Sequence, residues 1–479
     1  MRRRRLLSIF VLASTVAAPL LVSRTAHAQG WLADRRYTEG IGIKVGDFEL
    51  HPGIGISAGV DSNWFQRTYN TGFVNSNPVA AGIFSVTPSL YLSTLQAQRK
   101  EGDVNAAPPT VNFKLGAAAT YRAFVGDQDV INQNGIDGLS GNLNGRVDIL
   151  PQRPFSVGLQ AGYTRTLNPN TTGNPDQNFN QNLVNVGADF TITPGGGTLD
   201  WKFGYNGNFD FFDASGGSNP QAPFNNLQNT IFTRGTWKFG PKTAVIYDGN
   251  FAFVNYTQQA TAFNGLQNST PLRSRLGLNG LIGSRFGLTA FAGYGGSFAQ
   301  TPAGFANPVP QYDSVIGQIE AKFFLTANPA AEQNPNNVGL SVSSLAIGYN
   351  RDFSQSYLGS YYGSDRGYLK FSFFFGGRFL LSIEGGGGAR EYPQIFDSAG
   401  AQIGPNGGFT DGAVDATLFA EYRFTNTLGL NLTGKYTEEI SSTSIPADTA
   451  GGAQCNGGQD CYNMAFRRFE AYLGFRWFM

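Results

Sequence analysis

Apolar and polar side chains alternate along most of this chain with a period of two. In residues 199–212 the apolar positions of this alternation are Leu199, Trp201, Phe203, Tyr205, Phe209 and Phe211. Such a pattern places apolar groups on one face of a β-strand and polar groups on the other. In soluble sandwiches it usually lasts about four to eight residues. This run is longer, and it matches a tilted membrane strand of about 9–11 residues or more.

The same alternation returns in segments down the whole chain, for example in residues 139–149, 369–375, 414–424 and 428–436. Counting the segments predicts about eighteen strands, with about sixteen as the alternative, and single-chain bacterial barrels have an even number. The predicted strands span residues 47–62, 82–96, 110–126, 138–150, 155–168, 180–193, 198–212, 227–240, 243–258, 271–283, 286–299, 312–327, 339–353, 361–375, 378–392, 412–424, 428–439 and 464–479.

The connections between these segments fall into two alternating sets. The short set is 151–154, 194–197, 240–242, 284–285, 376–377 and 425–427. The longer set, rich in Asn, Gly, Pro and Ser, is 64–81, 168–180, 213–226, 259–270, 300–311, 393–411 and 441–461. Outer-membrane barrels sort their connections in this way. We therefore predict an all-β fold, a single transmembrane antiparallel β-barrel with short periplasmic turns and longer extracellular loops.

The N-terminal residues carry an export signal. Arg2 to Arg5 are followed by an apolar stretch from Leu6 to Val22 and by the small-x-small site Ala26-His27-Ala28, which is the organisation of a cleaved signal peptide. No later apolar run reaches the length of about 20 residues that a membrane helix needs. The expected division is a signal peptide over 1–28, a periplasmic segment over 29–46 and an outer-membrane barrel over 47–479.

Three segments on the predicted periplasmic side are long enough to meet a partner. They are residues 29–46, 97–109 and 328–338. Outer-membrane lipid is another expected partner. The barrel assembly machinery is expected as well, because the last strand is amphipathic and ends on aromatic residues and Met479. The formal net charge is +1, which gives no bulk attraction for nucleic acid.

The residue types give little support to catalysis. His51 is the only histidine left after signal cleavage, and it stands at the start of the first predicted strand. One histidine and two cysteines do not supply a structural zinc site. We therefore expect no enzyme activity, no cofactor and no metal. Residues Gly385 to Gly388 are not followed by a helix, so we interpret them as a bend in a strand or as the close approach of another segment.

Cys455 and Cys461 lie in the last predicted extracellular loop. Both are exported to an oxidising side of the cell, where disulfides form. We predict a disulfide between them, with the structural role of holding a glycine-rich loop; this loop could in addition narrow the mouth of the barrel.

Charged residues of both signs fall on the predicted inner face. Either they pair across strands and hold the wall, or they line a charge-balanced channel without strong ion selectivity. The candidate lumen-lining residues are Lys114, Arg122, Arg146, Asp189, Lys202, Asp210, Arg234, Arg273, Arg275, Glu320, Lys322, Lys370, Glu384, Glu421, Arg423, Lys435, Glu470 and Arg476. Tyr91, Phe232, Phe374 and Tyr472 could stack on sugar rings or pack within the wall.

Two regions carry a resemblance to a known family. The first is Phe48-Glu49-Leu50-His51-Pro52-Gly53-Ile54 with Gly59-Val60-Asp61-Ser62-Asn63-Trp64-Phe65, and the second is residues 436–442 with Tyr462 and the strand 466–479. The chain resembles the outer-membrane β-barrel (β-barrel porin 2-like) proteins encoded beside exopolysaccharide secretion genes.

The resemblance implies that the barrel is the outer-membrane passage for an exopolysaccharide or another surface polysaccharide. An inner-membrane co-polymerase or a periplasmic export protein would then dock beneath it. Barrels of about 16–18 strands leave an aqueous channel, and that width suits a glycan chain. Two alternatives stay open: a general or solute-selective porin, and a structural or adhesive barrel that anchors a surface machine.

Overall fold

The computed structural model describes residues 42–95, 110–126, 138–151, 153–167, 180–194, 197–213, 222–257, 266–283, 285–303, 305–325, 343–356, 358–375, 378–396, 400–446, 455 and 460–479. The predicted signal peptide lies outside these residues, as do most of the 29–46 segment and the connections 97–109 and 328–338. Within the described part of the chain, no helix is long and apolar enough to cross a membrane.

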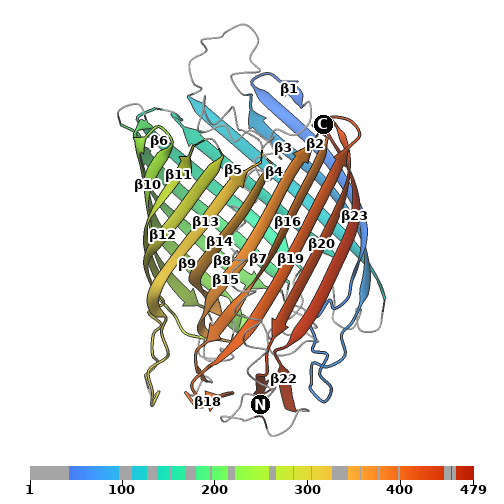
Figure 1. The fold of residues 1–479 in the computed structure, drawn as a ribbon, viewed down its shortest axis with the longest axis vertical. Coiled ribbons are helices and arrows are strands. Elements are labelled where there is room, and N and C mark those ends of the chain that lie inside the picture. The colour runs from blue at the N-terminus through green and yellow to red at the C-terminus, as the bar shows by residue number, and fades with distance from the viewer. Residues whose placement is uncertain are drawn as a thin grey trace.

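Eighteen strands form one closed antiparallel barrel, as predicted (Figure 1). They are β2 (Phe48–Asp61), β3 (Ala81–Thr94), β4 (Val111–Gly126), β5 (Leu139–Ile149), β6 (Phe155–Thr166), β7 (Gln181–Ile192), β8 (Leu199–Phe212), β9 (Asn226–Gly240), β10 (Thr243–Tyr256), β11 (Leu272–Ile282), β12 (Phe286–Gly296), β13 (Asp313–Phe324), β14 (Ser344–Ser356), β15 (Gly359–Phe375), β16 (Phe379–Tyr392), β19 (Phe409–Arg423), β20 (Leu428–Ile440) and β23 (Phe466–Phe478).

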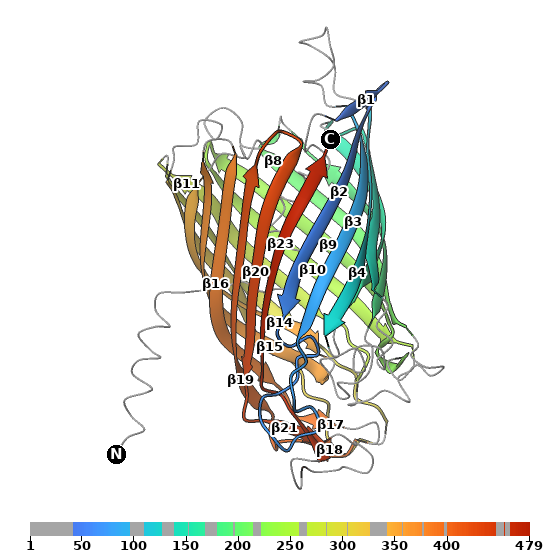
Figure 2. The same ribbon diagram turned by 90° about the vertical axis from the view of Figure 1, so that its right-hand side faces the viewer.

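The first and last barrel strands close the ring. β2 and β23 pair antiparallel from Gly53 opposite Phe478 to Asp61 opposite Glu470, and they lie side by side in Figure 2. The main-chain N–H of Met479 also donates to the carbonyl of Pro52 over 3.0 Å. Closure leaves no unpaired strand edge in the ring, which is what a sheet needs inside a lipid bilayer.

The period of two becomes an outer and an inner face. On β9, Leu227, Ile231 and Trp237 are exposed on the outside, whereas Gln228 and Arg234 line a cavity inside the ring. The other strands follow the same rule, so the outer surface is a belt of Leu, Ile, Val, Phe, Tyr and Trp. An apolar belt around a closed barrel is the arrangement of outer-membrane proteins, and we place the protein in the outer membrane.

The two ends of the barrel differ. The end that carries short connections, here called the turn end, also holds Met479 and the small strand β1 (Ile43–Val45), which pairs with β2 (Figure 1). The opposite end, here called the loop end, holds the small strands β17 (Ile395–Phe396), β18 (Gln402–Ile403), β21 (Ser444–Pro446) and β22 (Cys461–Asn463) together with the 3-10 turn η4 (Ala222–Phe224). In barrels of this class the short turns face the periplasm.

Most predicted strand limits agree with the structure within three residues. The exception is the start of β14, predicted at 339 and observed at Ser344, after a stretch outside the described residues. β14 also runs on to Ser356, because Ser354 and Ser356 still pair with β15. The small strands at the loop end fall within segments that the alternation identified only as loops.

Candidate functional site

A cavity of about 1390 Å³ lies inside the barrel. Its walls come from the inner faces of β5 to β11, from β14 to β16 and β20, and from two loop-end segments. The lining is balanced in charge: its basic residues are Arg146, Lys202, Arg234, Arg273 and Arg390, and its acidic residues are Asp189, Asp200, Asp210, Asp248 and Glu439. Many of the remaining lining residues are amides, so the cavity is polar without favouring either sign of charge.

One charge cluster sits on the β5–β8 wall. The guanidinium of Arg146 donates to both oxygens of Asp189, over 2.8 and 3.1 Å. The ammonium of Lys202 lies 3.2 Å from Asp189, and Arg146 also reaches Asp148 at 2.7 Å. Because these groups sit on inward positions of neighbouring strands, the register of the sheet brings them together. The cluster holds the wall while exposing charge to the cavity.

Amide side chains extend this wall. The Gln160 amide donates to the Asn206 side-chain oxygen over 2.8 Å, and the Gln181 amide donates to Asp210 over 2.7 Å. Asn208 and Gln228 line the same cavity. An amide both donates and accepts hydrogen bonds, so this wall can bind uncharged polar groups such as hydroxyls.

A second charge cluster lies on the inner face of β15, β16 and β19. The guanidinium of Arg366 pairs with Asp415 and lies 3.4 Å from Glu384. A Cβ atom added at Gly386 would lie 2.7 Å from the Arg366 guanidinium. The glycine at position 386 therefore leaves room for a buried arginine, which is the close approach of another segment that we expected there.

At the loop end, the two ends of the segment 62–80 pack against the inner wall of the barrel, whereas Tyr69 and Val74 between them are exposed. Trp64 and Phe65 are buried and pack with Val79 and Ile83. The Trp64 ring lies 4.9 Å from that of Phe124 on the inner face of β4. Phe65, Gln66 and Asn75 line the cavity, so this segment narrows the space inside the ring.

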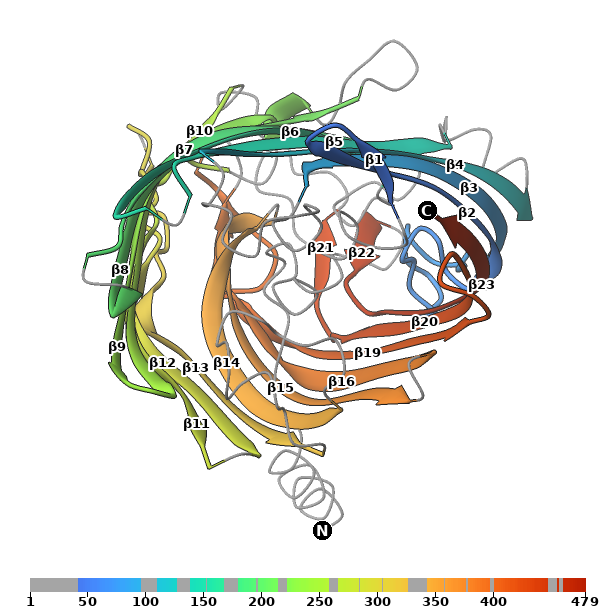
Figure 3. The ribbon, with the colours of Figure 1, turned by 90° about the horizontal axis from the view of Figure 1, so that it is seen from above.

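The hairpin formed by β21 and β22 also lies within the outline of the ring when the barrel is seen along its length (Figure 3). Tyr462, Asn463 and Met464 of this region line the cavity. Burial raises the pKa of the Tyr462 phenol above its ordinary value. Ile445 of β21 is buried against Ile395 and Ile403 of the hairpin formed by β17 and β18. The inward segments thus contact one another across the mouth.

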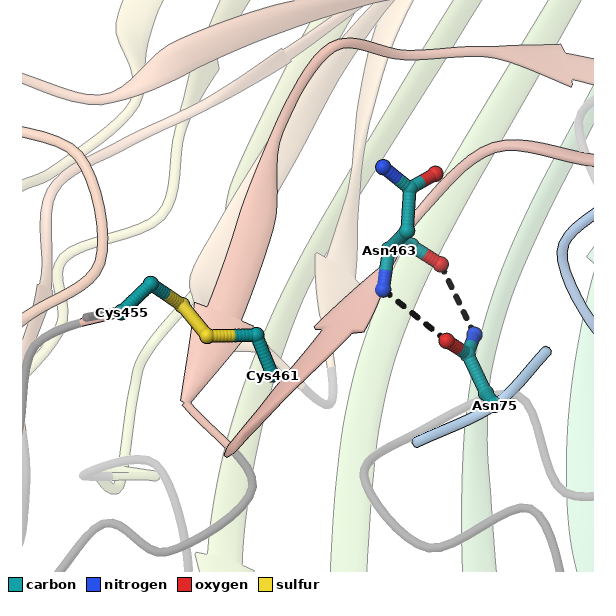
Figure 4. The surroundings of a disulfide bond; sticks show 4 residues. All are labelled: Asn75, Cys455, Cys461 and Asn463. Carbon is teal, nitrogen blue, oxygen red and sulfur yellow. Dashed lines mark hydrogen bonds between the residues drawn. A yellow bond between two sulfur atoms is a disulfide. The ribbon is translucent and has the colours of Figure 1, made fainter. Parts of the chain in front are cut away.

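A disulfide joins Cys455 to Cys461, with their Cα atoms 5.8 Å apart (Figure 4). Cys461 begins β22 and is buried, opposite Pro446 of β21. Both cysteines lie at the loop end, and formation of the bond in the exported protein stays a prediction for chemical analysis.

Six of the candidate lumen residues line the cavity: Arg146, Asp189, Lys202, Asp210, Arg234 and Arg273. The others occupy inward positions of the alternation outside that lining. Several of them pair with one another or with further inner-face charges, as the wall interpretation expects: Lys322 with Glu320, Lys370 with Glu384, Arg423 and Arg476 with Glu421, Lys435 with Glu470, and Arg275 with Asp248. The Arg122 guanidinium donates to Ser140 over 2.7 Å.

His51 has a structural environment. Its Nδ1 lies 3.0 Å from the carbonyl oxygen of Met479, and its Nε2 lies 3.0 Å from the Glu49 carboxylate. A G-x-S-x-G sequence does occur at Gly55 to Gly59, but it lies in the middle of β2 and the Ser57 hydroxyl bonds to Ser85 over 2.6 Å. The strand-to-helix turn that exposes a catalytic serine is missing there.

The alternation missed the residues that shape the mouth. Three residues that line the cavity at the mouth lie outside the predicted strands: Asn75, Tyr462 and Asn463. The ion pair between Arg390 and Glu439, at 2.7 Å, was not among the candidate lumen-lining residues. One signal was present: Trp64, Phe65 and Val79 are apolar residues in a loop expected to be polar. Buried apolar side chains in a loop indicate that it packs against the wall.

No protein-family model matches the sequence, and no curated protein matches it. Among solved structures, the chain is similar to OpdQ of Pseudomonas aeruginosa, at 9% identity, with 91% of this chain and 98% of that chain covered and a TM-score of 0.43. OccAB4 of Acinetobacter baumannii is 8% identical, with 90% and 98% covered and a TM-score of 0.42.

The siderophore receptor PiuA of Acinetobacter baumannii is 10% identical, with 91% of this chain and 82% of that chain covered and a TM-score of 0.39. These TM-scores are low, so the barrel assignment rests on the pairing of this chain's own strands. The resemblance to barrels encoded beside exopolysaccharide genes gains no support from a family model.

Proposed function

We propose that this chain is a solute-selective porin, a channel through which small hydrophilic solutes cross the outer membrane. The observation that carries the proposal is the polar, charge-balanced cavity of about 1390 Å³ enclosed by a barrel of eighteen strands. Barrels of this size leave an aqueous channel. The inward-folded loop-end segments reduce that channel, which favours small solutes over a long polymer.

The lining chemistry favours uncharged or zwitterionic solutes. The cluster around Asp189 joins Arg146 and Lys202 to one carboxylate, so neither sign of charge dominates that wall. A selective channel for ions usually carries a ring of one sign at its narrowest part. Amides such as Asn206 and Asn208 can exchange hydrogen bonds with solute hydroxyls.

Polysaccharide passage is the second candidate. Aromatic side chains, among them Phe232, Tyr362 and Tyr392, line the same cavity between polar groups, and a ring face flanked by hydrogen-bonding groups fits a sugar. The resemblance at residues 59–65 points to the same use. In this case a periplasmic or inner-membrane export protein would bind at the turn end.

Two measurements separate the candidates. The purified barrel is tested in liposomes for swelling by small sugars and amino acids, and a deletion strain is stained for surface polysaccharide. The porin proposal expects ready entry of small solutes and unchanged surface polysaccharide. Liposomes that stay impermeable, together with loss of one polysaccharide from the deletion strain, would favour export.

A further inference from the structure

The first inward segment and the hairpin formed by β21 and β22 are joined by an amide pair at the mouth. The Asn75 side chain donates to the carbonyl of Asn463 over 2.8 Å and accepts from the main-chain N–H of Asn463 over 3.0 Å (Figure 4). Both residues are buried. The amide thus satisfies both main-chain groups of one residue, as a neighbouring strand would, although the two residues lie 388 positions apart.

Further bonds strengthen this contact. The Val74 N–H donates to the carbonyl of Cys461 over 3.0 Å. The Thr68 hydroxyl and the Asn70 amide each lie 3.3 Å from the side-chain oxygen of Asn463. Residues 68–75 therefore bind β22 along its length, directly beside the half-cystine Cys461.

Each side of the contact is fixed to the barrel wall separately. The Asn63 amide donates to the carbonyl of Arg467 on β23 over 2.9 Å, and the Arg468 guanidinium lies over the Trp64 ring at 5.3 Å. On the other side, Ile445 is buried with Ile395 and Ile403, and this cluster packs against Tyr392 of β16 and Phe409 of β19. The two sides meet at the hydrogen bonds between Asn75 and Asn463, beside the disulfide.

The disulfide limits the freedom of β22. It bonds Cys461 covalently to Cys455, six residues earlier in the chain. The carbonyl of Cys461 also accepts the hydrogen bond from the Val74 N–H. Closing a loop removes conformations that the open chain would otherwise adopt. The disulfide thus stabilises the contact between β22 and residues 68–75, although neither cysteine belongs to residues 68–75. Cys455 is exposed, so a reductant in solution can reach the bond.

We infer that residues 62–80 and the hairpin formed by β21 and β22 form a single constriction that sets the upper size of solute passing through the channel, with the Asn75–Asn463 pair and the Cys455–Cys461 disulfide holding it narrow. This inference rests on the proposed porin function, because a size limit has meaning only in a channel that solutes cross. The constriction borders the cavity, because four of its residues line that cavity: Phe65, Gln66, Asn75 and Asn463.

The test compares entry of a monosaccharide, a disaccharide and a trisaccharide into liposomes that contain the full barrel. Asn75→Leu keeps the approximate size of the side chain and removes its hydrogen bonds. Thr71→Ala, at an exposed position in the same segment, is the matched control. We expect Asn75→Leu, and the wild type treated with reductant, to admit the trisaccharide several-fold faster relative to the monosaccharide. The control should keep the wild-type ratio.

Failure of the two proposals can be told apart. A wild type that admits no sugar contradicts the porin function, and the size limit falls with it. A wild type that admits the monosaccharide, with the same size dependence in Asn75→Leu and after reduction, overturns the constriction alone.

Hydrogen exchange on the wild type tests the inference without a transport assay. It also serves if the Asn75→Leu variant fails to fold. Reduction of the wild-type disulfide should raise amide exchange in residues 68–75, although these residues contain no cysteine. Unchanged exchange there after complete reduction would show that the bond does not support the contact, and would contradict the inference.

Discussion

At the scale of single residues, the face of the strand decides what a side chain can be. Phe371, Phe373 and Phe375 form a stacked ladder on the outer face of β15, with ring centres 6.0 and 6.1 Å apart. Ser372 has the opposite parity and faces Ser344 and Ser382 on the neighbouring strands. The same added charge should therefore cost more at position 373 than at position 372.

Phe373→Arg should destabilise the folded barrel by about 1 kcal/mol, because it places a charge on the lipid face two residues before the end of β15, where the cost is lower than at the bilayer centre. Ser372→Arg should cost little, since its charge enters the aqueous lumen. The measurement is the unfolding free energy in lipid vesicles, supported by the heat-modified band on a gel. Equal losses in both variants would contradict the assignment of faces.

Arg366 gives a second prediction at this scale. Its side chain is 7% exposed and pairs with Asp415, which is 11% exposed. Arg366→Met should destabilise the barrel by about 3–5 kcal/mol, because it leaves the Asp415 carboxylate buried without its arginine partner. Arg467→Met removes a pair with Glu438 in which the arginine is 61% exposed, and it should cost at most about 1 kcal/mol. Urea titration of both variants tests the contrast.

At the scale of elements, the seam between β2 and β23 has little tolerance for added volume at Gly59. A Cβ at Gly59 would meet the main-chain oxygen of Ala471 at a distance that no real contact allows. At Gly55, on the same strand and the same inner face, the nearest atom is 3.8 Å away, on Thr87. The two glycines thus offer a matched pair.

Gly59→Ala should slow closure of the barrel and lower the fraction that becomes heat-modifiable, because main-chain atoms of β23 must move to admit the methyl group. Gly55→Ala should fold like the wild type. Refolding into lipid vesicles, followed on gels over time, gives both rates. Normal closure of Gly59→Ala would mean that the register of the seam differs from the one described here.

At the scale of the whole molecule, balanced lumen charge should give weak ion selectivity. In a gradient of potassium chloride across a planar bilayer, the wild type should show a reversal potential near zero. Asp189→Asn removes the carboxylate shared by Arg146 and Lys202, so the potential should shift toward anion preference. Lys202→Gln should shift it toward cation preference. Shifts of the same sign in both variants would place these groups away from the ion path.

The sequence by itself determined the barrel. In a sheet with lipid outside and water inside, neighbouring side chains along each strand face different solvents, so strand number, limits and faces can be read from the alternation around Trp201 or Phe371. The inward parity of Arg146, Asp189 and Lys202 followed from the same rule, and so did the position of the cysteines in a loop at the mouth.

Only the tertiary structure decided how the mouth is built. The hydrogen bonds between Asn75 and Asn463 join residues that are 388 positions apart. Every Asn carries the same amide and main-chain groups, so the local sequence pattern does not identify which two asparagines will pair. The same holds for Arg366, whose two carboxylates and the glycine that makes room for it come from β16 and β19. Period-two patterning reports which solvent a residue meets, whereas these contacts depend on which distant segments the closed ring brings face to face.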